Sequence, residues 1–200
     1  MTGSSTRDWC DRPASLVAGL LLAATLLVAA AISYANEPAI YVRSADIHPG
    51  PDGYVLDATF QIELGSTLEE ALTKGVALNF VTELEVVYER WYLLNLINRD
   101  IASVEQRYRL SYNALTRQYR VATGALTQNV DSLLEALDLM ARVRNRPVAP
   151  TDAMEPGSVY AAQLRLRLDT SQLPKPFQIN AIGSKSWNLS SDWYRWTVRP

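Results

Sequence analysis

Residues 54–64 read YVLDATFQIEL, and this stretch decides the fold. Every even position is apolar, from Tyr54 to Leu64, and polar residues such as Asp57 and Gln61 alternate with them. Successive side chains of a β-strand point to opposite faces, so this alternation predicts a strand with one buried face. Residues 40–47 are expected to form its hairpin partner, because the intervening PGPDG of residues 49–53 supplies turn-forming Pro and Gly.

Four further stretches carry the same signal. These stretches alternate in polarity or are rich in β-branched and aromatic residues, and they are residues 78–94, 104–112, 115–121 and 160–168. Residues 193–198 are expected to close the chain as a last strand. Residues 104–121 predict a second hairpin, with Tyr108, Leu110, Tyr119 and Val121 as core candidates. About seven antiparallel strands without a βαβ rhythm predict a mainly β fold, an antiparallel β-sandwich whose immunoglobulin-like form is one candidate.

Two short helices are expected beside the strands. Ser66 followed by Glu69, with Gly75 as a stop, predicts a capping box on a helix that crosses between sheets. Asn129 or Asp131 is expected to cap a second helix that ends in the cluster Arg142, Arg144 and Arg146. Residues 145–158, with three prolines, are expected to form an exposed loop.

Size and charge restrict the class of protein. The chain has 200 residues, which fits one globular domain plus a targeting segment. Its formal net charge of -2 provides no basic field for a phosphate backbone, so we expect no nucleic-acid partner.

The amino terminus predicts export. Residues 16–32 are almost entirely apolar, and small residues at Ser33 and Ala35 give the spacing that a signal peptidase reads, with cleavage before Asn36. Residues 1–35 are therefore a signal peptide or an uncleaved membrane anchor, and residues 36–200 are a single exported domain. The protein is expected in the periplasm, anchored in the inner membrane if the segment is retained. Cys10 precedes the apolar run, so this is not a lipoprotein signal, and cleavage leaves no cysteine for a disulfide.

The single histidine limits the available chemistry. His48 cannot form a zinc site that needs two imidazoles, and a catalytic triad through it lacks any GxSxG sequence. Asp46, His48 and Asp52 suggest a calcium site only weakly, because the turn alone explains their spacing. We therefore predict no metal and no cofactor, and we assign no catalytic residue.

Charged residues alternate along two of the predicted strands. Glu83, Glu85 and Glu89 share one face and suggest the paired carboxylates of a glycosidase. Cross-strand ion pairing explains them better, because the arginines of other predicted strands, Arg107, Arg109, Arg165 and Arg167, alternate in the same way.

Aromatic residues gather in two clusters near residues 91–92 and 187–196. Trp91, Tyr92 and Trp193 are candidates for a contact surface, since exposed aromatics dominate binding interfaces. Trp193 and Trp196 have opposite parity, so in one strand only one of them is expected to face the core, and core filling is favoured for Trp196.

Several segments resemble one family. They are residues 77–92 (ALNFVTELEVVYERWY), 109–121 (RLSYNALTRQYRV), 164–181 (LRLRLDTSQLPKPFQINA) and 187–196 (WNLSSDWYRW). With these, residues 40–198 resemble the proteobacterial exported proteins of domain of unknown function family 4390. The resemblance implies a bacterial origin, export, and genes near a sensor kinase, and it transfers no activity.

Three functions follow as hypotheses. The first is a non-enzymatic envelope module that binds a protein or envelope ligand through sheet edges, loops or exposed aromatics. The second is a periplasmic hydrolase that uses carboxylates or His48, and the third is an external accessory of a sensor kinase.

Overall fold

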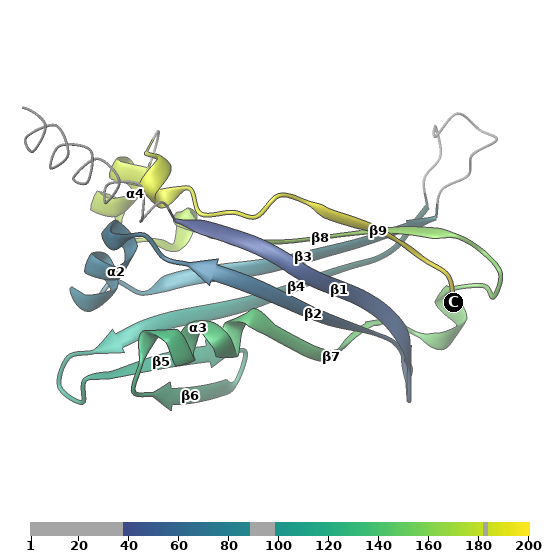
Figure 1. Ribbon diagram of the computed structural model, residues 1–200, viewed down its shortest axis with the longest axis horizontal. Coiled ribbons are helices and arrows are strands. Elements are labelled where there is room, and N and C mark those ends of the chain that lie inside the picture. Colours follow the sequence, from purple (N-terminus) through teal and green to yellow (C-terminus); the bar gives the residue numbers. More distant parts are fainter. Residues whose placement is uncertain (1–37, 89–98, 182–183) are drawn as a thin grey trace, which may run out of the picture. The chain divides into compact units, whose positions relative to one another are not determined.

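The computed structural model describes residues 38–88, 99–181 and 184–200. Two antiparallel sheets dominate this part of the chain (Figure 1). The smaller sheet has the strand order β1-β2-β7, with β1 (Ala39–Gly50), β2 (Gly53–Glu63) and β7 (Arg142–Ala149). The larger sheet has the order β6-β5-β4-β3-β8-β9. Its strands are β3 (Leu78–Tyr88), β4 (Arg99–Asn113), β5 (Gln118–Thr123), β6 (Leu126–Val130), β8 (Tyr160–Leu168) and β9 (Tyr194–Val198).

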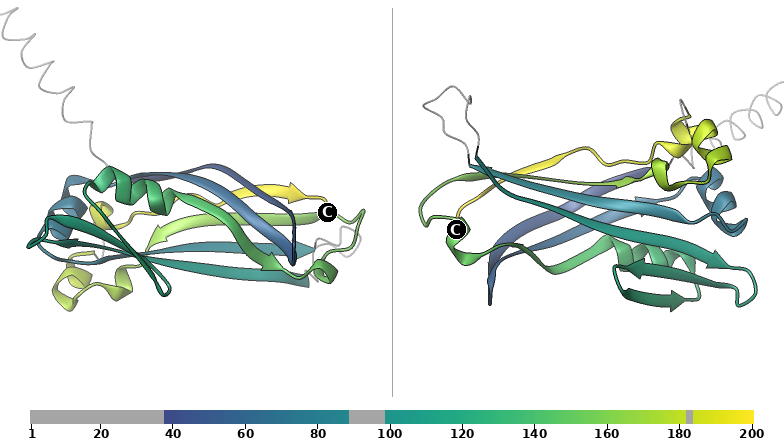
Figure 2. Two further views of the ribbon diagram at one scale, coloured as in Figure 1. Left: turned by 90° about the horizontal axis from the view of Figure 1, so that it is seen from below. Right: turned by 180° about the vertical axis from the view of Figure 1, so that it is seen from behind.

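One hydrophobic core lies between the sheets, which Figure 2 shows as two facing layers. The apolar residues at even positions in β2, β3 and β8 face this core, as their alternation predicts. Phe80, Leu84 and Leu164 are essentially inaccessible to solvent, and Leu56 and Ala58 meet them from the smaller sheet. The decisive prediction, that a period of two marks half-buried strands, is confirmed for these three strands.

The helices α2 (Ser66–Thr73), α3 (Leu133–Ala141) and α4 (Lys175–Ala181) complete the described fold. The helix α2 connects β2 to β3 and so crosses between the sheets, as expected. The predicted capping box is wrong, because Gly65 occupies the N-cap and no side chain caps the helix.

The expected cap of α3 is also wrong. Ser132 occupies that position, and its Oγ accepts a hydrogen bond from the Glu135 backbone N–H at 3.1 Å. Asn129 and Asp131 were the expected caps, but residues 126–130 form β6, so the helix begins later. The short helix α4 was not expected, so the described chain has three α-helices rather than two.

The prediction that residues 145–158 form a loop is wrong for its first third. The helix α3 ends where the arginine cluster begins, with Arg142 as its C-cap, and the cluster itself lies in β7. This strand pairs with β2 through Val143 opposite Ala58 and Arg146 opposite Leu56. The second hairpin is confirmed, although β5 starts at Gln118 and residues 114–117 form the turn. Three of its core candidates are buried, and Tyr119 is half-buried.

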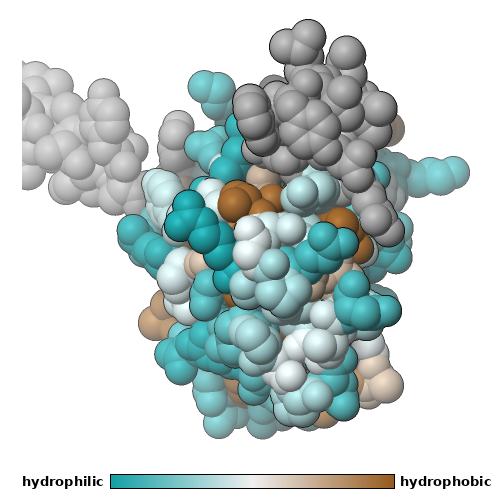
Figure 3. Space-filling view, turned by 90° about the vertical axis from the view of Figure 1, so that its right-hand side faces the viewer, coloured by the Kyte–Doolittle hydropathy of each residue, from teal (hydrophilic) through white to brown (hydrophobic). Residues whose placement is uncertain are grey.

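Figure 3 shows the end of the molecule at the right of Figure 1. This face is mostly hydrophilic or neutral, and apolar residues appear on it only in small areas. Among the described residues, no helix is both long and apolar enough to cross a bilayer.

Candidate binding groove

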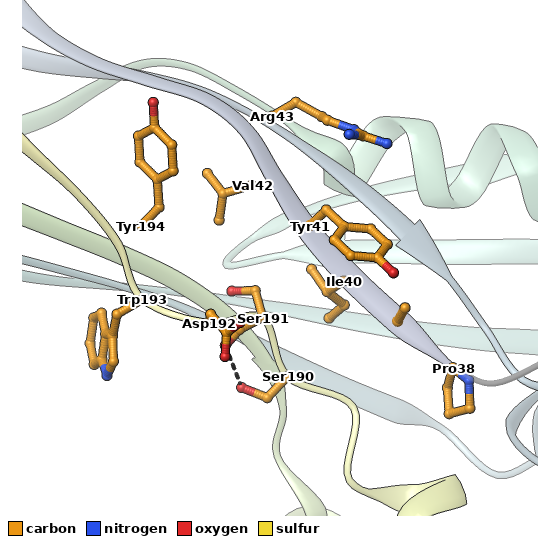
Figure 4. Close-up of a pocket in the computed structure, with 11 residues that line it drawn as sticks. Pro38, Ile40, Tyr41, Val42, Arg43, Ser190, Ser191, Asp192, Trp193 and Tyr194 are labelled. Atoms are coloured by element: carbon orange, nitrogen blue, oxygen red, sulfur yellow. Dashed lines mark hydrogen bonds between the residues drawn. The ribbon is translucent and has the colours of Figure 1, made fainter.

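A groove of about 410 Å³ lies where the edges of the two sheets approach one another (Figure 4). One wall is residues 38–43, which lead into and begin β1, and the other wall is residues 190–194, which lead into β9. These walls are far apart in the sequence. We call this feature the edge groove.

The second wall is fixed by hydrogen bonds to β8. The Ser191 backbone N–H donates to the Leu166 carbonyl at 2.9 Å, and the Leu166 N–H donates to Ser191 Oγ at 3.1 Å. The regular ladder resumes with Tyr194 opposite Leu164. Asp192 and Trp193 therefore lie together opposite the single residue Arg165, which is the arrangement of a β-bulge. Such bulges redirect side chains, and here the bulge forms part of the groove wall.

Trp193 lies on the outer face of the larger sheet. The guanidinium carbon of Arg165 lies 4.3 Å from the centroid of its ring, a cation–π contact. Trp196 lies on the opposite face, where it is partly buried against the core. The prediction that the two tryptophans face opposite sides is confirmed. Tyr194 shares the face of Trp196, and the two ring centroids are 5.7 Å apart.

The first wall is an edge strand. Within the described residues no strand pairs with the outer edge of β1, so that edge presents backbone donors and acceptors along the groove. Tyr41 is 51% exposed on this wall. Arg43 forms a cation–π contact with its ring at 5.5 Å and donates from Nε to Gln61 Oε1 at 2.8 Å. These contacts hold the Arg43 side chain over β1 and β2.

The edge groove offers three kinds of contact to a ligand. They are an unpaired strand edge, the rings of Tyr41, Trp193 and Tyr194, and the exposed carboxylate of Asp192. The Ser190 hydroxyl is already used, since it donates to the Ser191 carbonyl at 3.0 Å. This combination suits recognition of an extended chain better than it suits a covalent reaction.

The carboxylates suggested for catalysis belong to an ion-pair ladder on the outer face of the larger sheet. Glu83 accepts hydrogen bonds from Arg165 Nε at 2.5 Å and from Arg167 Nε at 2.8 Å. Partial burial alone would raise the pKa of Glu83, but the bonds and charges of these arginines outweigh it and lower the pKa below 4.5. Glu85 accepts instead from Gln163 Nε2 at 2.5 Å. Cross-strand ion pairing is thus confirmed for Glu83, and its carboxylate is held ionised.

His48 lies in β1, half-buried, opposite Val55. In the described ranges, no group of three or more His, Cys, Asp or Glu side chains is placed to hold a metal ion. The structure therefore brings no ligand cluster together around Asp46, His48 and Asp52.

Several predicted residues lie outside the described residues. They are the cleavage candidates Ala35 and Asn36, the contact candidates Trp91 and Tyr92, and Glu89. Trp193 lies in the edge groove, as part of its wall. Sequence reasoning missed Tyr41 and the Ser190–Asp192 backbone. The SSDW of residues 190–193, which leads into the last predicted strand, was a signal for the second of these but not for Tyr41.

The fold and groove define a mainly β protein with two antiparallel sheets and a ligand-sized cleft at their edges. The chain belongs to the family described as domain of unknown function (DUF4390), whose model matches residues 37–197. This confirms the resemblance seen in the sequence. Comparison with curated proteins and with solved structures found no match.

Proposed function

We propose that this protein is an exported, non-enzymatic binding module of the bacterial cell envelope. Its N-terminal segment directs it to the periplasm and, if uncleaved, holds it at the inner membrane. In this proposal the edge groove accepts one extended segment of a partner protein, which pairs with β1 as an added strand. The observation that carries the proposal is the outer edge of β1, which pairs with no strand of the described residues and lies beside a ligand-sized groove.

In the proposed mode of binding, the backbone and the side chains of the partner segment make different contributions. An added strand gains affinity from main-chain hydrogen bonds, and pockets for alternate side chains add specificity. Tyr41 and Tyr194 supply large rigid surfaces on the two walls (Figure 4), and Asp192 favours a partner segment with a basic residue. The Arg165 contact holds the Trp193 ring in place before binding.

We further propose that the two layers form a β-sandwich. The common core supports this assignment. Strands β3 to β6 follow one another in the larger sheet as a meander, so the topology gives little support to the immunoglobulin-like form, whose strands follow a Greek key.

Photocrosslinking in living cells tests the proposal. The full chain carries a photoreactive phenylalanine analogue at Tyr41, and a matched control carries it at Leu115, which is 96% exposed in the β4–β5 turn. We expect the Tyr41 position alone to capture one discrete partner, and mass spectrometry to locate the crosslink in one extended segment. Equal capture at both positions, or none at Tyr41, would refute the groove as the binding site.

The two other hypotheses make different predictions. Capture of the external domain of a sensor kinase would support the accessory role. A hydrolase predicts instead that Glu85→Gln or His48→Ala abolishes turnover by the purified protein without lowering its melting temperature. For a glycosidase pair that includes Glu83, its ionised carboxylate is unsuited to the role of general acid, and its oxygens are already bonded to Arg165 and Arg167.

A further inference from the structure

A β-bulge in β7 turns an arginine toward the space between the sheets. Between the pairs Val143 opposite Ala58 and Arg146 opposite Leu56, β7 has one residue more than β2. Asn145 takes up the extra length with a φ of 49°, and its backbone N–H donates to Asp57 Oδ1 at 2.7 Å. Because Leu56 and Ala58 both face the core, Val143 and Arg146 share the inner face. In a regular strand, Arg146 would face outward.

Arg146 lines a pocket of about 360 Å³ between β7 and α3 on one side and β4, β5 and β6 on the other (Figure 1 shows these elements). Arg142 and Arg144 line the same pocket, whereas none of its lining residues is Asp or Glu. Arg142 is paired with Asp138 at 2.8 Å. No carboxylate of the described residues lies within ion-pair distance of Arg144 or Arg146. The pocket therefore has an uncompensated positive charge.

One nitrogen of the Arg146 guanidinium is unsatisfied. Its Nε is buried and has no hydrogen-bond acceptor among the described residues. Burial of such a group costs free energy unless an acceptor is supplied. Tyr108 lies near it: burial raises the pKa of the Tyr108 hydroxyl, and the charge of Arg146 and the Thr82 hydroxyl lower it in part. A protonated Tyr108 is a second donor beside the guanidinium.

The rest of the pocket combines four aliphatic side chains with the polar side chains of Gln106, Thr123 and Gln128. Val121 and Val143 are buried in its floor, and Leu126 and Leu139 are 60% and 38% exposed at its wall. With the two valines, these leucines form an apolar strip beside the cationic end of the pocket.

We propose that this pocket binds a small organic carboxylate with an apolar body. The carboxylate would accept hydrogen bonds from the Arg146 guanidinium and from the Tyr108 hydroxyl, and the apolar body would cover Leu126 and Leu139. The fork of a guanidinium matches carboxylate and phosphate alike, so the preference for an organic carboxylate rests on the apolar strip, which a bare phosphate would leave uncovered. The volume is at the lower end of the range for ligand sites, which restricts the ligand to a small molecule.

Calorimetric titration with sodium hexanoate tests the proposal. The full chain is held in lipid nanodiscs, with empty nanodiscs as the blank. We expect saturable binding that Arg146→Gln weakens by about tenfold or more, because bonds to a charged group are lost. The matched control, Arg120→Gln, removes an exposed arginine that bonds Asn129 on β6, outside the pocket lining, and it should leave the affinity unchanged. The neutral analogue hexanamide should bind more weakly than hexanoate.

Four results would overturn the proposal: no saturable heat with hexanoate, equal affinity for hexanamide, an equal loss in Arg120→Gln, or tighter binding of inorganic phosphate than of hexanoate. If circular dichroism shows that Arg146→Gln does not fold, Arg146→Lys replaces it. Lysine keeps the charge and loses the planar fork, so weaker hexanoate binding is again expected. The comparison of hexanoate with hexanamide on the unaltered chain needs no variant.

Discussion

Replacement of Glu83 by glutamine should destabilise the protein measurably at neutral pH. The Glu83 side chain is 13% exposed, and those of Arg165 and Arg167 are 31% and 34% exposed. Exposed ion pairs contribute about 0.2–1 kcal/mol, and breaking a buried pair costs about 3–5 kcal/mol. Two partly screened bridges lie between these limits, so we expect Glu83→Gln to lower the free energy of unfolding by about 1–2 kcal/mol. This corresponds to a fall in Tm of about 2–8 °C.

The effect should depend on pH in one direction. Because the pKa of Glu83 is lower in the folded protein than its usual value of 4.5, the carboxylate stabilises the fold above that pH. The contribution is lost as the pH falls through the folded pKa. The difference between the unaltered chain and Glu83→Gln should therefore be constant from about pH 7 to about pH 5.5 and shrink below about pH 4.5.

Urea denaturation of both chains across this pH range measures the difference. Glu105 is the matched control, because it lies directly opposite Glu83 in β4 and its ion pair with Arg107 is exposed on both sides. Glu105→Gln should change the free energy of unfolding by at most about 0.5 kcal/mol. A Glu83→Gln chain as stable as the original at neutral pH, or a difference that persists unchanged in acid, would refute the assigned ion pairs.

Two further substitutions test the core and the β1–β2 hairpin. Phe80→Ala removes a fully buried ring from a central strand and should cost about 3–5 kcal/mol in urea denaturation, whereas Leu115→Ala, at a site 96% exposed, should cost less than about 0.5 kcal/mol. Gly53→Ala should lower Tm strongly, because its φ is 140° and the new Cβ would lie 2.3 Å from the Ala149 carbonyl oxygen. Gly124→Ala, at a φ of 59° with open space around it, should lower Tm much less, and equal effects of the two would contradict the placement of β7 beside the hairpin.

The elements that could be predicted from the sequence are those whose burial alternates. In β8, every second residue from Tyr160 is buried, so the pattern of burial repeats the pattern of hydrophobicity. The strand β6 gave no such signal, because its first four residues are exposed and only pairing with β5 holds it. The strand β7 was missed because its arginines resemble a helix end, its proline resembles part of a loop, and its bulge breaks the alternation at Asn145.

The candidate site could be predicted only in part. The opposite parity of Trp193 and Trp196 follows from residue spacing alone, and it places one ring outside the core. The edge groove itself depends on residues near 40 and near 190 meeting in space, and no local pattern encodes that contact. The inward direction of the Arg146 side chain likewise cannot be predicted from the sequence, because it depends on a register shift against β2.

Strands of the two sheets alternate in blocks along the chain, so neither sheet can be completed until late in synthesis. The strand β7 joins β2 after the chain has already supplied four of the six strands of the larger sheet, and the contact of Asp57 with Asn145 spans 88 residues. The strand β9 closes the other sheet only near the C-terminus. The nascent N-terminal half therefore leaves the ribosome with its apolar faces uncovered, a topology typical of slow folding and of dependence on chaperones.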